Sequence, residues 1–111
     1  MAEAYLRLRG FAVLARNRAA GGGEVDIVAR DGAALVFVEV RCRAEDSWTT
    51  ASASIGALKR QRLRRCAGAL ARLPEFQWSQ RTLRVDVVAI TLSADGAGLR
   101  HLRGVDLSRG R

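Results

Sequence analysis

Two acidic residues interrupt a pair of otherwise apolar segments in the first half of the chain. Asp26 lies in the segment 24–30 and Glu39 in the segment 35–43, and both segments are rich in β-branched residues. Facing carboxylates repel each other, and burying one without a partner costs free energy, so a cation is expected between them. That cation is either a divalent metal such as magnesium, which prefers oxygen ligands, or the guanidinium of Arg41.

A single β-hairpin is predicted to bring the two acids together. The Asp-Gly pair at residues 31–32 separates the segments and is a typical hairpin turn signal. Because side chains alternate with a period of two, a loop at 31–34 sets Asp26 directly opposite Glu39. A two-residue loop at 31–32 leaves the acids diagonal on one face, and only a bulge or an odd loop separates them. Arg41 shares the face of Glu39 in either register.

A helix with a lysine in its apolar stripe is predicted to follow the hairpin. Ser54 is a candidate N-cap, and the helix should run to about Leu73, because Pro74 cannot continue it. Lys59 falls within the stripe, where its ammonium needs a hairpin carboxylate, a bound phosphate or a path to solvent. The apolar members of the stripe are Ile55, Leu63, Cys66, Leu70 and Leu73. Four arginines lie outside it and are expected to be solvated: Arg60, Arg64, Arg65 and Arg72.

The remaining periodic segments complete one α/β domain. We expect a short helix at 2–9, strands at 11–15, 83–90 and 98–102, and a glycine-rich loop at 17–23. No Gly-Lys-Ser/Thr motif follows these glycines, so the loop is interpreted as a connector and not as a phosphate cradle. The order α-β-β-β-α-β-β predicts a mixed central β-sheet with flanking helices. The domain is expected to span 1–102, followed by a basic, frayed tail at 103–111.

The composition indicates a basic domain without membrane or secretion signals. The 111 residues carry a formal net charge of +8, which favours a polyanion such as nucleic acid as partner. Of the 19 cationic side chains only Lys59 is a lysine, a bias that a G+C-rich genome also produces on any protein surface. No apolar run reaches the roughly 18 residues of a membrane span, and no signal peptide opens the chain, so a cytoplasmic protein is expected.

Three further sets of residues have weaker claims to a chemical role. Trp48, in a polar loop beside the hairpin, either stacks on a base or folds back onto the core. Arg84 and Asp86 share a strand face, either as a structural ion pair or as part of a site. Cys42 and Cys66 are expected to be free thiols, since the spacing of cysteine and histidine gives no zinc site.

The combined motifs are typical of a known family. The chain resembles the YraN-like family of small bacterial proteins in two segments, Gly23-Glu24-Val25-Asp26-Ile27-Val28 and Val36-Phe37-Val38-Glu39-Val40-Arg41-x-Arg43. The resemblance continues through Lys59 to Arg84-Val85-Asp86-Val87-Val88 and covers about residues 2–92. That family is assigned to the PD-(D/E)xK, restriction-endonuclease-like class of endonucleases, so the resemblance implies the same mixed-sheet fold.

The resemblance also implies a reaction and a set of site residues. Asp26 and Glu39 would hold one or two magnesium ions, with manganese as a substitute and the main-chain carbonyl of Val40 as the third protein ligand. Arg41 and Lys59 would then hold the phosphate or orient the attacking water in the hydrolysis of phosphodiester bonds. The expected substrate is DNA, with branched or damaged DNA among the candidates, and a homodimer is one arrangement that the class uses. Contacts to the nucleic acid are expected from Arg43, Trp48, Lys59 and Arg62.

The chain departs from the pattern of the class at two positions. Arg41 stands where the wider nuclease class usually has lysine, and arginine stays protonated, so it cannot be a general base. The family's first helix carries a glutamate at a position that would precede Met1, so either the native chain begins upstream or this acid is absent. Glu3 lies one helical turn further on, and no role is carried to it.

Two alternatives to a nuclease therefore stay open. One is a nucleic-acid-binding module that has the same fold and is catalytically weak or inactive. The other is a structural protein whose acids pair with Arg41 and Lys59.

Overall fold

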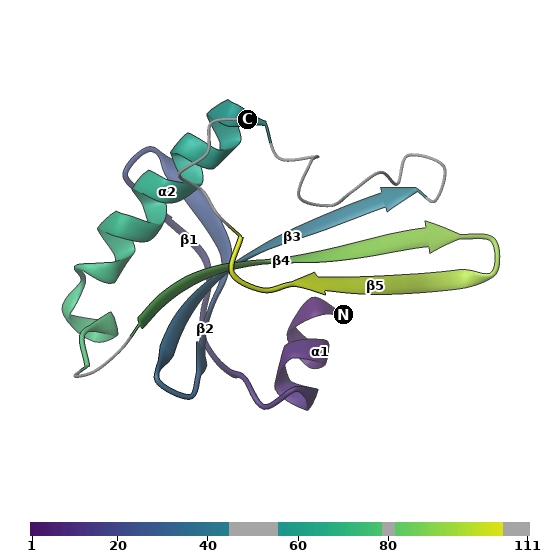
Figure 1. The fold of residues 1–111 in the computed structure, drawn as a ribbon, viewed down its shortest axis with the longest axis horizontal. Helices are drawn as coiled ribbons and strands as arrows, with labels where there is room; N and C mark the ends of the chain where they lie inside the picture. Colours follow the sequence, from purple (N-terminus) through teal and green to yellow (C-terminus); the bar gives the residue numbers. More distant parts are fainter. Residues whose placement is uncertain (45–55, 79–81, 106–111) are drawn as a thin grey trace.

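The protein is an α/β domain built on a mixed five-stranded sheet. A computed structural model describes residues 1–44, 56–78 and 82–105. The elements are α1 (Ala2–Leu8), β1 (Ala12–Ala20), β2 (Gly23–Asp31), β3 (Ala34–Ala44), α2 (Ala57–Ala71), a 3₁₀ turn η3 (Pro74–Phe76), β4 (Thr82–Ser93) and β5 (Gly96–Leu102). The strands lie in sequence order, and only the β3–β4 pair is parallel (Figure 1). The predicted fold class and order of elements are therefore confirmed.

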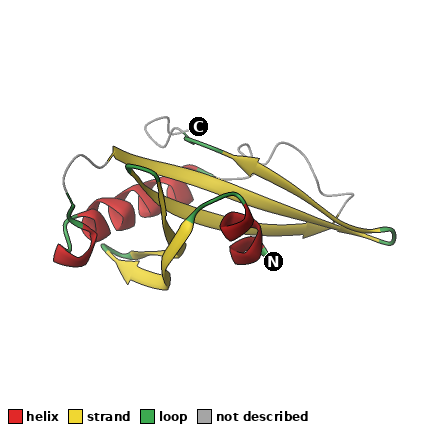
Figure 2. Cartoon of the chain, turned by 90° about the horizontal axis from the view of Figure 1, so that it is seen from below, coloured by secondary structure: helices red, strands yellow, loops and turns green. Residues whose placement is uncertain are grey.

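The two helices lie on opposite faces of the sheet (Figure 1). One core cluster packs α1 against the sheet through Ala2, Leu6, Phe11, Ile27, Ala29, Ala34, Val36, Val38, Val88 and Ile90. The other packs α2 and η3 against the opposite face through Val25, Val28, Leu35, Phe37, Leu63, Cys66, Ala67, Leu70, Ala71 and Phe76. Beyond these cores the β4–β5 hairpin extends away from both helices (Figure 2). Each face of β3 is thus packed against a different helix.

The hairpin of β2 and β3 has the first of the two predicted registers. Arg30 pairs with Leu35, and Asp31 pairs with Ala34 across a two-residue turn. This register sets Asp26 in line with Glu39, as expected for the even loop. Beyond the Ile27–Val38 pair, however, β2 and β3 no longer form a ladder, whereas β2 stays paired with β1 as far as Gly23. The two strands therefore separate at the acidic positions.

The glycine-rich segment does not form the predicted loop. β1 continues through most of it to Ala20, and Gly21 and Gly22, at φ of 59° and 84°, form a two-residue turn into β2. The prediction of a loop at 17–23 was therefore wrong, since residues up to Ala20 belong to β1. β1 is an edge strand with one neighbour, so its arginines reach solvent without leaving the sheet.

Helix α2 agrees with the predicted stripe except at its charged positions. Leu63, Cys66 and Leu70 are buried, whereas Ile55 and the proposed cap Ser54 lie outside the described residues. Arg60, predicted to be solvated, is 9% exposed, because it lies on the same helical face as Leu63 and its aliphatic stem is covered. Lys59, predicted to lie within the stripe, keeps 47% of its side chain exposed.

The chain after β5 is attached to the sheet at two points. The amide of Gly104 donates a hydrogen bond to Asp86, and the amide of Val105 donates one to the carbonyl of Val85 at 2.7 Å. The rest of the tail predicted at 103–111 lies outside the described residues. Neither α1 nor α2 has the length and apolar content of a membrane span, and the described residues contain no other such helix.

Candidate functional site

The two predicted acids meet where β2 leaves β3. Asp26 turns its carboxylate toward β3, and Oδ2 accepts a hydrogen bond from the main-chain amide of Val40 at 2.7 Å. This bond takes the place of a ladder bond at the point where pairing ends after Ile27–Val38. Where β2 and β3 stop pairing, this hydrogen bond therefore holds Asp26 beside Val40, the residue after Glu39.

Glu39 is a buried carboxylate that projects toward α2. Its side chain is only 5% exposed, and Oε2 lies 2.8 Å from Nζ of Lys59. The lysine reaches it from the first turn of α2, with its own stem half in solvent. Of the acceptors predicted for Lys59, the hairpin carboxylate is the one that the structure provides.

The pKa of Glu39 is raised above its ordinary value. Burial is the main cause, and the negative charge of Asp26 together with a side-chain hydrogen bond between the two acids acts in the same direction. The ammonium of Lys59 lowers the pKa of Glu39 but does not outweigh burial and Asp26 together. The carboxylate pair is thus short of positive charge, even with Lys59 in place.

Arg41 does not neutralise the pair. Among the described residues, the ion pair of Glu39 is with Lys59, and no ion pair joins Arg41 to either acid. The Nε atom of Arg41 is buried and makes no hydrogen bond within the described chain. A buried donor without an acceptor is rare in native proteins, and this one belongs to the residue two positions after Glu39.

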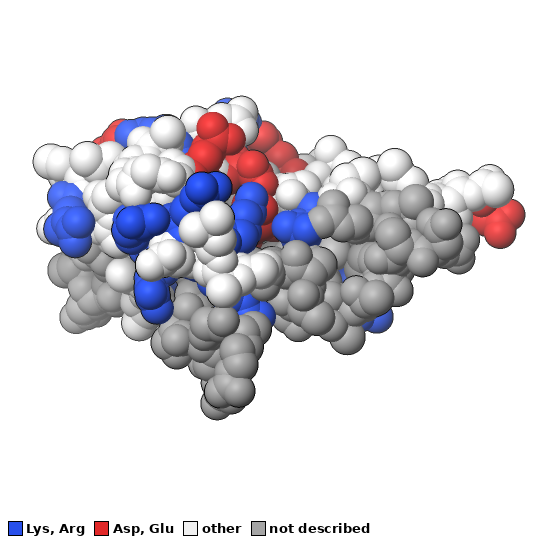
Figure 3. Space-filling model, turned by 90° about the horizontal axis from the view of Figure 1, so that it is seen from above, with Lys and Arg blue, Asp and Glu red and all other residues white. Residues whose placement is uncertain are grey.

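A polar pocket of about 310 Å³ adjoins the acids through Lys59. Its lining consists of Gly22, Gly23, Glu24, Lys59, Arg62 and Leu63. Figure 3 shows Lys and Arg side chains beside a group of acidic side chains on the face seen from above. The predicted nucleic-acid contacts Lys59 and Arg62 therefore line one pocket, whereas Trp48 lies outside the described residues. Arg43 is placed only by its main chain, which pairs with Thr91.

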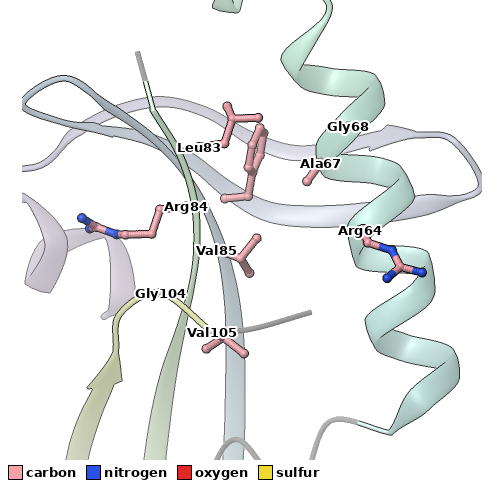
Figure 4. Close-up of a pocket in the computed structure, with 9 residues that line it drawn as sticks. Arg64, Ala67, Gly68, Leu83, Arg84, Val85, Gly104 and Val105 are labelled. Carbon is pink, nitrogen blue, oxygen red and sulfur yellow. The ribbon is translucent and has the colours of Figure 1, made fainter. Parts of the chain in front are cut away.

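A second pocket, of about 430 Å³, lies further along α2 and is mainly apolar. Figure 4 shows Leu83, Val85 and Val105 facing α2 there, while Arg84 extends to the other side of β4. The described lining contains no acidic residue, so this pocket offers no ligands for a cation. The charged pocket beside Lys59 is the one connected with the predicted site.

Sequence reasoning missed a buried polar cluster on the α1 face. Asp86 is fully buried and accepts hydrogen bonds from Arg84 at 2.9 and 3.0 Å, from the Gly104 amide at 3.0 Å and from Nε2 of His101 at 2.8 Å. Nδ1 of His101 lies 2.9 Å from the hydroxyl of Tyr5 on α1. Arg84 and Asp86 are thus an ion pair, one of the two predicted alternatives. The Asp95-Gly96 pair was the available turn signal: the observed turn at 94–95, between the paired Ser93 and Gly96, pairs Val88 with His101 and puts His101 on the face of Asp86.

Glu3 and the cysteines take no part in either cluster. Glu3 pairs with Arg7 at 2.9 Å and with Arg16, and these arginines hold its pKa at about 2. Cys42 and Cys66 are not joined by a disulfide bond and remain thiols, as predicted. In the described part of the chain no three His, Cys, Asp or Glu side chains gather as a metal cluster.

The mixed sheet, the helix on each face and the hairpin that splits at two acids define an α/β protein compatible with a restriction-endonuclease-like fold. A family model described as "Uncharacterised protein family UPF0102" matches residues 1–90, and the chain belongs to this family. The resemblance to YraN-like proteins is thereby confirmed.

Relatives from three bacteria match most of the chain. A UPF0102 protein of Beutenbergia cavernae is 41% identical over 106 residues, which cover 95% of this chain and 88% of the relative. One from Pseudomonas aeruginosa is 43% identical over 93 residues, covering 84% of this chain and 74% of the relative. One from Bordetella petrii is 49% identical over 85 residues, covering 72% of this chain and 51% of the relative.

Proposed function

We propose that this protein is a magnesium-dependent endonuclease that hydrolyses phosphodiester bonds in DNA. The observation that carries the proposal is the buried Glu39 carboxylate beside Asp26, with a pKa that stays raised although Lys59 contacts it. A fold gains nothing in stability from such a pair, because a buried carboxylate is held beside a second negative charge. Carboxylates kept in this state are typical of sites that bind a cation.

The residues present fit a hard divalent cation. Asp26 and Glu39 would hold it through carboxylate oxygens, and the main-chain carbonyl of Val40 is the third ligand that the family resemblance supplies. Val40 is adjacent, since its amide already contacts Asp26. When bound, the cation would stabilise the negative charge that develops on a phosphate during hydrolysis.

The cationic side chains of the site have distinct tasks in this proposal. Lys59 both holds the carboxylate of Glu39 and lines the polar pocket, so it can orient a phosphate or a water between them. Arg41 lies two residues after Glu39, and its guanidinium would donate to a phosphate oxygen through nitrogens other than the buried Nε. It cannot accept a proton, so its role is limited to holding and orienting.

The decisive experiment is cleavage of plasmid, hairpin and four-way-junction DNA with magnesium or manganese. Asp26→Asn and Glu39→Gln should each lower the rate by at least about 100-fold, the loss typical when a group that stabilises transition-state charge is removed. Asp95→Asn is the matched control, because it removes an exposed carboxylate at the β4–β5 turn. Manganese binding measured by calorimetry should be lost in the first two variants and kept in the control. Unchanged cleavage in both site variants would rule out this pair as the active site.

A binding module without turnover is the second candidate, and Arg41 is the observation that favours it. A site with arginine at the position of the usual lysine lacks that proton acceptor. In this case the wild-type protein binds the same DNA substrates and leaves them intact under magnesium and under manganese. Metal-dependent cleavage that disappears with Asp26→Asn would exclude this second candidate.

A further inference from the structure

The turn between β1 and β2 sits directly on the backbone of α2. A Cβ atom on Gly23 would lie 2.7 Å from the carbonyl oxygen of Arg62, and one on Gly21 would lie 2.9 Å from that of Arg65. Gly22, between them, has open space on the side where a Cβ would point. The close approach therefore requires glycine at positions 21 and 23. At Gly22 the main chain of the turn is not covered by a side chain.

The bare turn and the first two turns of α2 enclose the 310 Å³ pocket. This volume is at the lower end of the range for small-ligand pockets. Lys59 belongs to the pocket lining and also contacts Glu39, so the pocket and the carboxylate pair share one wall. A group bound in the pocket would lie next to a group bound at the acids.

The charges of the pocket favour an anion. Lys59 and Arg62 supply two cations to the lining and Glu24 one carboxylate, and because Lys59 is already paired with Glu39, Arg62 is the cation open to a ligand. Arg62 is exposed and forms no ion pair with any residue in the described ranges, so its guanidinium is available. The central amides of the Gly21–Gly22 turn lie beyond the last ladder pair, Ala20–Gly23. A guanidinium beside glycine amides is a combination that binds phosphate.

We propose that this pocket is a phosphate subsite, which holds the backbone phosphate next to the one at the acids. Arg62 is its main donor, and Glu24 limits how tightly the anion binds. The inference rests on the proposed function for the identity of the ligand as nucleic acid. It goes beyond that function by assigning a fixed place to the neighbouring phosphate, and it gives the glycine turn a role in binding.

The test compares Arg62→Gln with Arg72→Gln, which removes the same charge from an exposed position at the end of the same helix. Affinity for a labelled DNA duplex, measured by fluorescence anisotropy without divalent metal, should fall about tenfold in Arg62→Gln, the equivalent of one charge-assisted hydrogen bond. The slope of log affinity against log salt should fall by about 0.9, the value for one phosphate contact. Arg72→Gln should leave both quantities close to wild type, and Arg62→Lys should recover part of the loss.

Glu24→Gln is the variant with the opposite sign, because it removes the one carboxylate of the pocket. It should tighten DNA binding at low salt, and Asp95→Asn, which also removes an exposed carboxylate, should not. Equal weakening in Arg62→Gln and Arg72→Gln would overturn the subsite and leave only diffuse charge attraction. Tighter binding in Asp95→Asn by the same factor as in Glu24→Gln would overturn it as well.

Inorganic phosphate provides the second arm of the experiment and separates the two sources of the ligand. If ³¹P NMR shows phosphate binding that depends on Arg62 while DNA affinity does not, the subsite serves a free anion and the nucleic-acid assignment is wrong. A failure of the subsite can be distinguished from a failure of the proposed function. A protein that cleaves DNA through Asp26 but ignores the Arg62 substitution refutes the subsite alone, and one that never cleaves but keeps the Arg62 dependence refutes catalysis alone.

Discussion

At the scale of single residues, Glu39 and Lys59 form an asymmetric pair. The carboxylate is buried, whereas the ammonium keeps 47% of its side chain exposed. Removing the lysine leaves a buried charge without a partner, but removing the carboxylate leaves a cation that water already solvates. Removing the lysine should therefore cost more stability than removing the carboxylate.

Glu39→Gln should remove a pH-dependent loss of stability. Because the pKa of Glu39 is raised in the folded protein, the fold binds more protons than the unfolded chain, and stability falls as pH rises from 4.5 through the raised pKa. Urea unfolding between pH 4 and pH 8 should show this fall in wild type and a flatter curve in the variant. If the free energy of unfolding depended on pH in the same way in wild type and in Glu39→Gln, the pKa of Glu39 would not be raised in the fold.

Lys59→Met should destabilise the protein at pH 7 by about 1–2 kcal/mol, the lower part of the range for an orphaned buried group because solvent screens the half-exposed partner. The same substitution in a Glu39→Gln background should cost much less, which a double-mutant cycle measures directly. An equal cost in both backgrounds would show that Lys59 acts through packing and not through Glu39.

At the scale of elements, the contact between the β1–β2 turn and α2 depends on two glycines, Gly21 and Gly23, of which Gly23 makes the closer approach. Gly23→Ala would set a methyl group 2.7 Å from a helix carbonyl, so the turn and helix must move apart. We expect a loss of about 1–3 kcal/mol by thermal or urea unfolding. Gly68→Ala, in the last turn of α2 with open space at its Cβ, is the control and should stabilise by up to about 0.5–1 kcal/mol through helix propensity. Equal effects of both substitutions would contradict the close contact.

The polar cluster around Asp86 connects α1, β4 and β5, and it should govern stability in acid. Burial alone would raise the pKa of Asp86, but hydrogen bonds from Arg84, Gly104 and His101 outweigh it and lower the pKa. The stabilisation from Asp86 is thus present above pH 3.8 and is lost as pH falls through the lowered pKa.

Asp86→Asn should cost about 3 kcal/mol at pH 7, as for other broken buried pairs. Asp31→Asn removes the other carboxylate that contacts Arg84, at 2.9 Å, but this carboxylate is 29% exposed. It should therefore cost below about 1 kcal/mol. Urea unfolding at pH 7 measures both, and comparable losses would show that burial of Asp86 adds nothing.

The sequence predicted an element correctly where a single local pattern determines it. The turn at residues 31–32 and the two-residue period were enough for the register that joins Asp26 and Glu39. They failed where tertiary context decided, as at β1, whose polar residues are tolerated only because the strand is at an edge. The link between Asp86 and His101 depends on the β4–β5 register alone, but its continuation to Tyr5 also needs the position of α1, which no local signal specifies.

At the scale of the whole molecule, the charge and the site reinforce each other. A net charge of +8 surrounds a local group of carboxylates on the α2 face, so a polyanion is attracted overall while a cation is favoured at one point. We expect affinity for duplex DNA to fall steeply with salt, with a slope of about −0.9 for each phosphate contacted. Anisotropy titrations from 50 mM to 200 mM sodium chloride provide the measurement. A flat dependence would count against nucleic acid as the partner.

The eleven-pair ladder between β3 and β4 has a consequence for how such a protein can change over time. Neighbouring residues of β3 project to opposite faces of the sheet. Inserting one residue in the turn before β3 would therefore move its apolar and acidic side chains to the opposite faces relative to β2. Such a chain would fail to fold and would not survive as a variant lacking only its acids. Related proteins can therefore lose the carboxylates by point substitution and keep the fold. An insertion or deletion of an odd number of residues in that hairpin would disrupt the fold.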